Sequence, residues 1–306
     1  MNLWYALTDS DSFRRATKSG PGRAVLGSRV FRRANIERNR IRTAFSGIRR
    51  PDEFASVRTF CCFVGHNKSG TSMVGGLLDA HPRVLCSDEV DAFQYVDAGF
   101  RRDQLFHVIA KGSRAELRKG RVTARRLQPY SYFVPGQWQG RSDRPLVVGD
   151  STSGKTTRRL GEQPELLDRV RAGAPAIEVK LLHVVRNPFD PISVMMVRGR
   201  RTFANAIEHY FSACRSLATI RRHVAGRDIL LVRHEEFVAT TAQSLRRICA
   251  FVGVDAEPAY LDACSAIIRD VPDRSRTMVE WTPRWIAEVE QRIADVDFLA
   301  GYSYDN

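Results

Sequence analysis

The amino-acid sequence predicts an α/β fold with a doubly wound parallel sheet flanked by helices, in a single domain that follows a basic N-terminal extension. Short apolar, β-branched runs alternate along the chain with segments whose apolar residues recur at helical spacing. Such alternation is typical of a parallel sheet whose ligands bind at the carboxyl ends of the strands. The chain has 306 residues, 43% of them hydrophobic, which suffices for one large core.

We place the extension at residues 1–55 and the domain at residues 56–306, and the sequence contains no internal repeat. Pro188 should end one strand and begin the next helix, and Gly253 should end another helix. Strands are expected at residues 59–64, 83–86, 145–149, 178–185 and 228–232. Helices are expected at residues 73–78, early in 90–144, and at 164–171, 202–224, 240–252, 258–268 and 283–294. The aromatic segment 130–138 either shapes a substrate cleft or forms surface loop.

A short polar turn, residues 66–72, joins the first expected strand to the first expected helix. Backbone N–H groups in such a turn, and the positive end of the helix, point to one place. Gly70 lets the backbone approach a ligand closely, and Lys68 supplies a positive charge. Thr71 and Ser72 add hydroxyl donors. The segment therefore predicts a P-loop-like site for phosphate or sulfate rather than an ordinary turn with a surface lysine.

The charge of the chain is uneven. The net charge is +14, and residues 1–50 hold 12 basic and 3 acidic side chains, a difference of +9, so the remainder carries only +5. An anionic ligand or surface is expected, but the domain itself need not bind nucleic acid. The six cysteines form no Cys-x-x-Cys pair, which favours buried reduced thiols in a reducing, cytoplasmic compartment. No apolar run is long enough to span a membrane.

The extension carries one apolar stripe on a very basic segment. Its members recur at three- and four-residue steps and are Phe31, Ala34, Ile41, Phe45 and Ile48. Three interpretations remain open: a helix packed on the domain, a helix at an anionic lipid surface, or a disordered segment. The Arg-rich, acid-poor composition is also typical of an organelle-targeting peptide.

Three segments, in order, resemble those of sulfotransferases that use 3′-phosphoadenosine 5′-phosphosulfate (PAPS). Residues 67–72 are similar to the 5′-phosphosulfate loop of that family, and residues 184–193 to its 3′-phosphate motif. Residues 229–253 are similar to its later strand, turn and helix, with His234 where tyrosine is common. The resemblance covers about residues 57–304. It implies a P-loop-like fold, PAPS as the sulfate donor and no metal ion.

The resemblance also implies roles for individual residues. Lys68 would stabilise the negative charge that grows on the leaving phosphate oxygen, as in phosphoryl transfer. The residues implied to hold PAPS are Lys68, Ser69, Gly70, Thr71 and Ser72 at the 5′ end, and Arg186 and Ser193 at the 3′-phosphate. Arg274 and Arg276 lie where the family often places basic residues against the cofactor and are further candidates. Ser193 departs from the usual eukaryotic spacing, because it stands one place nearer Arg186 than is common.

A general base is needed to take the proton of the acceptor hydroxyl. The sequence lacks the Lys-Thr-His segment of many cytosolic members and resembles instead the carboxylate-using branch, which includes carbohydrate and tyrosylprotein sulfotransferases. The pattern of residues 78–89 aligns Glu89 with the base of that branch, and Asp88 is the alternative. A solvated helix start is the non-functional interpretation of both acids. Lys155 could replace a lysine that the family often places where Asp150 stands here.

Two other functions compete with sulfate transfer. Residues 149–156 match the nucleotide-triphosphatase pattern G-x-x-x-x-G-K-[ST], which would indicate an ATP- or GTP-dependent kinase or NTPase. A basic anion-binding module without turnover is the second. We expect a PAPS-dependent sulfotransferase acting on a small-molecule, carbohydrate or glycolipid acceptor, with a phenol or peptide also compatible. Its location would be cytoplasmic, with peripheral membrane contact through the basic N-terminus as an option.

Overall fold

The structure is a computed structural model that describes residues 29–49, 52–122, 130–172, 175–268 and 274–306. It contains a five-stranded sheet with the strand order β2-β3-β1-β4-β5, and every pair of neighbouring strands is parallel. The strands are β1 (Thr59–Gly65), β2 (Val84–Ser87), β3 (Val147–Asp150), β4 (Glu178–Val185) and β5 (Ile229–Arg233). All five expected strands are therefore confirmed, each to within two residues.

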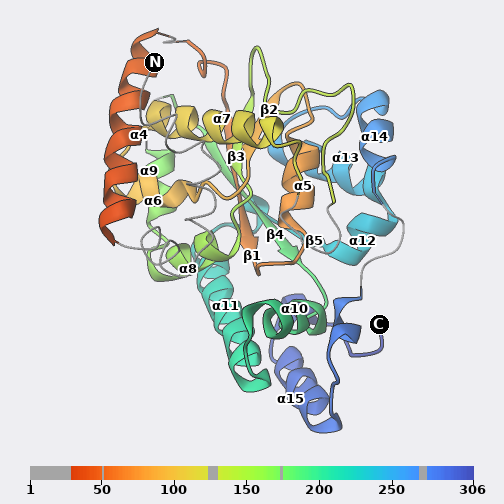
Figure 1. The fold of residues 1–306 in the computed structure, drawn as a ribbon. Helices are drawn as coiled ribbons and strands as arrows, with labels where there is room; N and C mark the ends of the chain where they lie inside the picture. Colours follow the sequence, from red (N-terminus) through yellow and green to blue (C-terminus); the bar gives the residue numbers. More distant parts are fainter. Residues whose placement is uncertain (1–28, 50–51, 123–129, 173–174, 269–273) are drawn as a thin grey trace, which may run out of the picture.

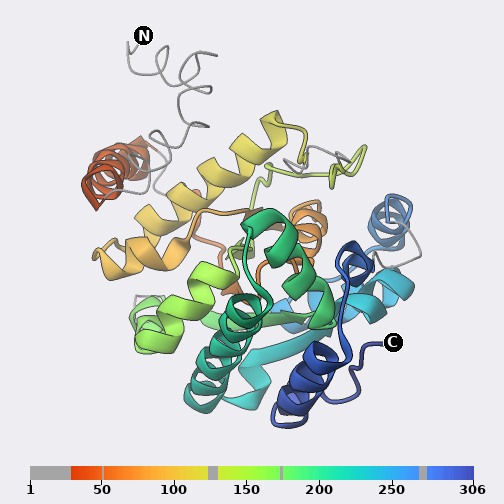
Figure 2. The same ribbon diagram turned by 60° about the horizontal axis from the view of Figure 1, so that its bottom comes forward.

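Alternate residues of β1 divide the core into two apolar clusters, because successive side chains of a strand point to opposite faces. Phe60 and Cys62 belong to one cluster, and Cys61 and Phe63 to the other. Helices therefore cover both faces of the sheet (Figures 1 and 2), as the sequence predicted.

The helices of the first cluster are α6 (Ala92–Asp97), α7 (Arg102–Arg118), α8 (Gly154–Glu162), α9 (Leu166–Arg171), α10 (Phe189–Gly199), α11 (Phe203–His223) and α15 (Pro283–Ala294). The helices of the second are α5 (Thr71–Leu78), α12 (His234–Ala239), α13 (Thr241–Val252) and α14 (Pro258–Ser265). Short 3₁₀ segments lie at Gly226–Asp228, Ser275–Met278 and Asp297–Leu299.

Two helices, α8 and α12, were not predicted. Helix α8 begins with small and polar residues, and Leu160 is its one buried aliphatic side chain. It therefore lacks the apolar periodicity that marks a helix in sequence. Helix α12 has only six residues and starts directly from β5. Each follows a strand and completes a strand-to-helix connection.

Helix α4 (Arg29–Arg49) lies along one edge of the molecule and packs on α7 (Figure 1). The extension is thus helical over this range, which excludes the disordered interpretation there. Its buried side chains are polar, Asn39 and Thr43. The stripe residues Ile41, Phe45 and Ile48 are 60%, 63% and 78% exposed. The helix therefore packs on the domain, as one of the three interpretations expected, but through the face opposite the stripe, which is mainly polar and includes the partly buried Ile36. The side chain of Phe31 lies outside the described residues.

All six cysteines are buried and free of disulfide bonds. Burial raises the pKa of the Cys61 thiol well above its usual value, which keeps it protonated. The prediction of buried reduced thiols is confirmed. No helix within the described ranges is both long and apolar enough to cross a membrane.

Candidate active site

The polar turn after β1 has the backbone shape of an anion-binding loop. Lys68 and Gly70 both have positive φ angles, 73° and 94°, and helix α5 starts at the next residue, Thr71. Left-handed residues between extended and helical ones turn successive N–H groups toward a common point. A Cβ atom on Gly70 would lie 2.4 Å from Nδ1 of His234, so this position requires glycine for space as well as for conformation.

The side chains of the loop offer several donors. Lys68 is exposed, whereas Ser69 is buried and its hydroxyl has no partner among the described residues. The Thr71 hydroxyl lies 3.3 Å from that of Ser153. A flexible ammonium group, hydroxyls and a helix N-terminus are the donor set that a phosphosulfate group requires. The residues present therefore fit the 5′ end of PAPS.

His66, the first residue of the loop, packs on Tyr210 of α11. Its ring stacks on that of Tyr210 with the ring centroids 3.7 Å apart, and Nε2 lies 2.9 Å from the Tyr210 carbonyl oxygen. Burial lowers the pKa of His66 to about 4. The imidazole is therefore neutral at physiological pH, and it shapes the loop rather than serving as an exposed base.

The segment after β4 touches the loop directly. Arg186 is buried, and its Nη1 donates to the carbonyl oxygen of Lys68 over 3.4 Å, across 118 residues of sequence. Its Nε lies 3.5 Å from Oδ2 of Asp190, in the first turn of α10. The structure thus brings two of the predicted site segments together at the carboxyl ends of β1 and β4.

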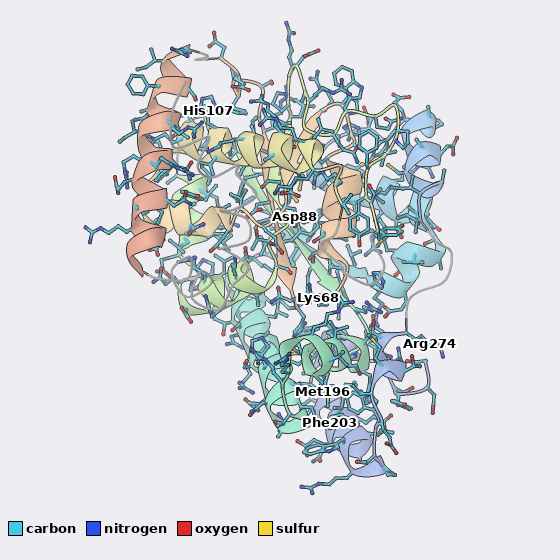
Figure 3. All side chains as sticks on the ribbon, in the orientation of Figure 1. Lys68, Asp88, His107, Met196, Phe203 and Arg274 are labelled. Atoms are coloured by element: carbon cyan, nitrogen blue, oxygen red, sulfur yellow. The ribbon has the colours of Figure 1, made fainter. Side chains whose placement is uncertain are left out.

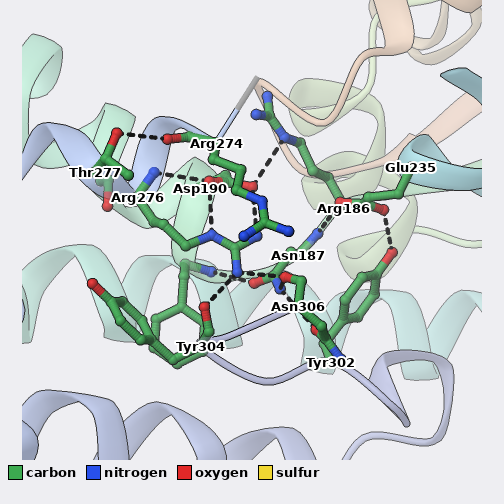
Figure 4. Close-up of polar contacts among 12 residues, drawn as sticks. Arg186, Asn187, Asp190, Glu235, Arg274, Arg276, Thr277, Tyr302, Tyr304 and Asn306 are labelled. Carbon is green, nitrogen blue, oxygen red and sulfur yellow. Dashed lines mark hydrogen bonds and ion pairs between the residues drawn. The ribbon is translucent and has the colours of Figure 1, made fainter. Parts of the chain in front are cut away.

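Asp190 links Arg186 to Arg276. The Arg276 side chain donates through Nε and Nη2 to the two Asp190 carboxylate oxygens, at 3.2 and 3.1 Å. Its Nη1 donates to the backbone oxygens of Ser303, Tyr304 and Asn306 (Figure 4). Arg274 lies on the surface beside this cluster, with a 3.5 Å contact to the carbonyl oxygen of Asp305 (Figures 3 and 4).

Ser193 is a predicted ligand that has no exposed surface. It is fully buried in α10, and its hydroxyl accepts a hydrogen bond from the Trp281 indole N–H over 3.0 Å. In this arrangement the structure does not bring it together with the exposed Arg274. Asn187, which the sequence analysis gave no role, donates instead to the carbonyl oxygens of Ser303 and Asn306.

The two candidate bases have different surroundings. Glu89 is exposed, with a left-handed φ of 56°. Asp88 is largely buried, and its Oδ1 accepts hydrogen bonds from the hydroxyls of Ser151, at 2.8 Å, and Ser72, at 3.3 Å. Desolvation raises the pKa of Asp88, against the lowering effect of the Ser151 hydrogen bond. Because Ser72 belongs to the loop helix, Asp88 lies beside the anion-binding loop, and Glu89 is the next residue of the chain.

Asp150 fixes the segment that carries these acids. It stands at the end of β3, fully buried, and accepts hydrogen bonds from the backbone N–H of Ala92 at 2.8 Å and the hydroxyl of Ser87 at 3.0 Å. Burial raises its pKa to about 6. Sequence reasoning missed this role, since the partners of Asp150 are about sixty residues away; the one visible signal is an acid that directly follows an apolar strand.

The rival phosphate loop at residues 149–156 lacks the required geometry. Gly149 and Asp150 belong to β3 and pair with residues of β1 and β2. Only three buried residues, 151–153, separate this strand from α8, and Lys155 is exposed on the helix. A phosphate-cradling loop needs its backbone N–H groups free, but here two of the eight residues of the motif belong to the sheet, and the Ser151 N–H donates to the carbonyl oxygen of Ser87.

The sheet is parallel, an anion-binding loop follows its central strand, and an arginine that follows the neighbouring strand contacts that loop. This arrangement is typical of α/β proteins that bind a phosphate-bearing ligand. Within the described residues, no group of three or more His, Cys, Asp or Glu side chains is placed to hold a metal ion.

Residues 174–258 match the model of the sulfotransferase family, a range that includes β4, Arg186, Ser193 and β5. This match covers the later part of the chain and agrees with the resemblance to sulfotransferases that its motifs indicated. A search among curated proteins finds no match.

Solved structures similar to this chain include three sulfotransferases. One is from Mycobacterium avium, with 11% identity and a TM-score of 0.48, covering 94% of this chain and 91% of the other. One is from Alicyclobacillus acidocaldarius, with 18% identity and a TM-score of 0.42, covering 79% and 95%. The third is a mouse sulfotransferase complexed with PAP, with 14% identity and a TM-score of 0.40, covering 78% and 84%.

Proposed function

We propose that this protein transfers a sulfuryl group from PAPS to a hydroxyl or amine of an acceptor, in line and with a carboxylate general base. The observation that carries the proposal is the contact between Arg186 and the Lys68 carbonyl oxygen. An arginine from the family-matched region thus lies against the anion-binding loop. A ligand with phosphate groups at both its 5′ and 3′ ends would need positive charge at both of these places.

The residues of the loop would hold the 5′ end of the donor, which supplies the sulfuryl group. Lys68 and the backbone N–H groups of residues 69–72 would bind the phosphosulfate and stabilise charge on the phosphate oxygen as its bond to sulfur breaks. In a loose, in-line transfer this positioning and charge stabilisation are the main contributions of the protein. Both depend on a preformed loop, which Gly70 and the buried His66 provide.

The 3′-phosphate would lie near Arg186. Arg274 is exposed at the same edge and could contact it without rearrangement of the core. Arg276 and Ser193 are buried and have internal partners, so their direct participation would require movement of the segments that cover them. We retain both as proposed ligands, with Arg276 also holding Asp190 in place for Arg186.

Glu89 is the proposed general base. It would take the acceptor proton as the new oxygen–sulfur bond forms and the bond between sulfur and the leaving phosphate oxygen breaks. Three of the non-glycine residues with positive φ, Lys68, Glu89 and Asp91, belong to the loop and to this acidic segment. Backbone strain of this kind is often concentrated at functional sites. Asp88 is the alternative base, favoured by its raised pKa and its contact with Ser72.

Calorimetry with adenosine 3′,5′-bisphosphate, and with ATP plus Mg²⁺, tests the proposal. The bisphosphate should bind more tightly than ATP, and Lys68→Ala and Arg186→Ala should each weaken it by roughly tenfold or more. Lys155→Ala is the matched control, because this lysine belongs to the rival motif. Tighter binding of ATP that depends on Lys155 would contradict the proposal and favour an NTPase.

Turnover is measured separately with labelled PAPS and a pool of sugars, glycolipids, phenols and peptides. Sulfation of one class identifies the acceptor. Binding of the bisphosphate without transfer to any acceptor would favour an anion-binding module. The aromatic segment 130–138 is the proposed contact for the acceptor, since Phe133 and Trp138 are both exposed.

A further inference from the structure

Helix α4 exposes an apolar ridge that a folded domain would ordinarily bury. Ile41, Phe45 and Ile48 follow one another at steps of four and three residues, so they lie on one face of the helix. They are also the three most exposed of the large hydrophobic side chains in the described part of the chain. Contiguous exposed apolar surface of this kind usually marks an interaction site.

The orientation of the helix is set by polar contacts on its opposite face. The Asn39 side chain donates to the Tyr95 hydroxyl over 3.0 Å and accepts from the Lys111 ammonium over 3.2 Å. Arg40 donates to the carbonyl oxygen of Ala98 over 2.6 Å, and its guanidinium lies 4.8 Å from the Phe100 ring centroid. A rotation of α4 that buried the ridge would break these contacts. The packing of α4 on the domain therefore keeps the ridge exposed.

The charge along the ridge is strongly positive. Residues 33–49 contain one acid, Glu37, which lies 3.4 Å from Arg40, and the five arginines 33, 38, 40, 42 and 49. On a helix of 3.6 residues per turn, Arg38, Arg42 and Arg49 fall together along one flank of the apolar ridge. Apolar side chains beside a row of arginines match a surface that is apolar inside and anionic outside.

We propose that the ridge formed by Ile41, Phe45 and Ile48 docks α4 flat on a membrane surface that contains anionic lipid. The isoleucines and phenylalanine would enter the boundary between headgroups and acyl chains, and the flanking arginines would contact lipid phosphates. Nucleic acid would satisfy the arginines but would leave the aliphatic side chains in water. Helix α4 itself lies along one edge of the molecule (Figure 1).

Vesicle flotation with the full-length protein tests this proposal. The protein should float with vesicles of phosphatidylcholine and phosphatidylserine, and should remain unbound with phosphatidylcholine alone. Higher salt should weaken binding, because exposed charges are screened. The combined variant Ile41→Ser, Phe45→Ser, Ile48→Ser should reduce binding by more than about tenfold, because it removes the inserted apolar surface.

Val122→Ser is the matched control, since Val122 is 48% exposed beyond the last turn of α7 and does not belong to the ridge. Circular dichroism and bisphosphate binding should show that both variants are folded. Wild-type protein that fails to float on anionic vesicles overturns the proposal. Three other results would also overturn it. In the first, the ridge variant floats like the wild type. In the others, the wild type does not bind vesicles, and the ridge instead mediates either dimer formation or binding to nucleic acid.

Discussion

Asp88 and Glu89 are neighbours in sequence but differ in accessibility, and this difference allows their roles to be separated. Glu89→Gln removes an exposed carboxylate without disturbing a hydrogen bond that the structure shows. We expect bisphosphate affinity to change little, while turnover falls by about 10²-fold or more because the proton acceptor is lost. Calorimetry and initial rates with labelled PAPS measure the two effects independently.

Asp88→Asn is the companion variant. An asparagine can still accept hydrogen bonds from Ser72 and Ser151 but carries no charge, so we expect a smaller loss of turnover than in Glu89→Gln. The reverse order, with Asp88→Asn inactive and Glu89→Gln active, would assign the base to Asp88. Unchanged turnover in both variants would remove the carboxylate base from the mechanism.

Gly70 offers a second prediction at the scale of one residue. Gly70→Ala would place a Cβ atom 2.4 Å from His234 Nδ1 at a φ of +94°. We expect the loop to shift, with a loss of unfolding free energy of roughly 1–3 kcal/mol and weaker bisphosphate binding. Thermal denaturation and calorimetry measure these changes.

Gly226→Ala is the control for this substitution. Gly226 has no atom within 4 Å of a built Cβ and no left-handed φ. Alanine there should leave both stability and binding near the wild-type values. If Gly70→Ala behaved in the same way, the backbone shape of the loop would not matter for ligand binding.

At the scale of elements, Asp150 joins the end of β3 to the segment before α6. Its pKa is raised to about 6 from 3.8, so the folded protein binds more protons than the unfolded chain between these values. The contribution of Asp150 to the unfolding free energy should therefore be fully present below about pH 4 and should be lost as the pH rises through 6, by on the order of 2–3 kcal/mol.

Asp150→Asn should remove this contribution to the pH dependence. The variant loses one acceptor for the Ala92 N–H, so its stability at a single pH is not informative. The comparison is the change in unfolding free energy from pH 4 to pH 7, by denaturant titration, in wild type and variant. Equal slopes would show that Asp150 does not titrate in this range.

The sequence predicted the sheet better than it predicted the connections. Five strands could be placed because buried strands form continuous apolar runs between turn residues. Helix α8 was not predicted because its buried side chains include Thr156 and Thr157, which are polar and do not add to an apolar pattern. The Thr157 hydroxyl accepts a hydrogen bond from the Gly65 backbone N–H. Local composition predicts an element only when its buried face is apolar.

Some residues of the candidate site could be predicted from the sequence and others could not. The loop at residues 66–72 and Arg186 were predictable, because each directly follows an apolar strand. Asp190 was not assigned a role, although it stands four residues after Arg186, because its second partner, Arg276, is 86 residues further along the chain. The exposure of the α4 ridge was also hidden, since a stripe at helical spacing does not reveal which way the helix will turn.

At the scale of the whole molecule, the extension and the domain should differ in stability. The buried side chains of α4 are polar, and Ile36 is only partly buried against the core, so the docking of this helix buries little apolar surface. The strands β1 and β4 lie in the centre of the sheet and are almost wholly buried. Local opening free energies are lowest where few apolar contacts are made. We propose that residues 1–55 form a unit that can detach from the domain at residues 56–306.

Native-state hydrogen exchange of Asn39→Ala tests this division. Loss of the Asn39–Tyr95 hydrogen bond should speed exchange in α4 by roughly tenfold, equivalent to about 1.4 kcal/mol, and leave β1 and β4 unchanged. Asn35→Ala is the control, because its side chain accepts a hydrogen bond only from Arg38 of the same helix. If Asn39→Ala accelerated exchange equally in α4, β1 and β4, the helix and the sheet would unfold as one cooperative unit. The boundary near residue 55 would then be wrong, and docking of α4 on a membrane would have to move with the whole domain.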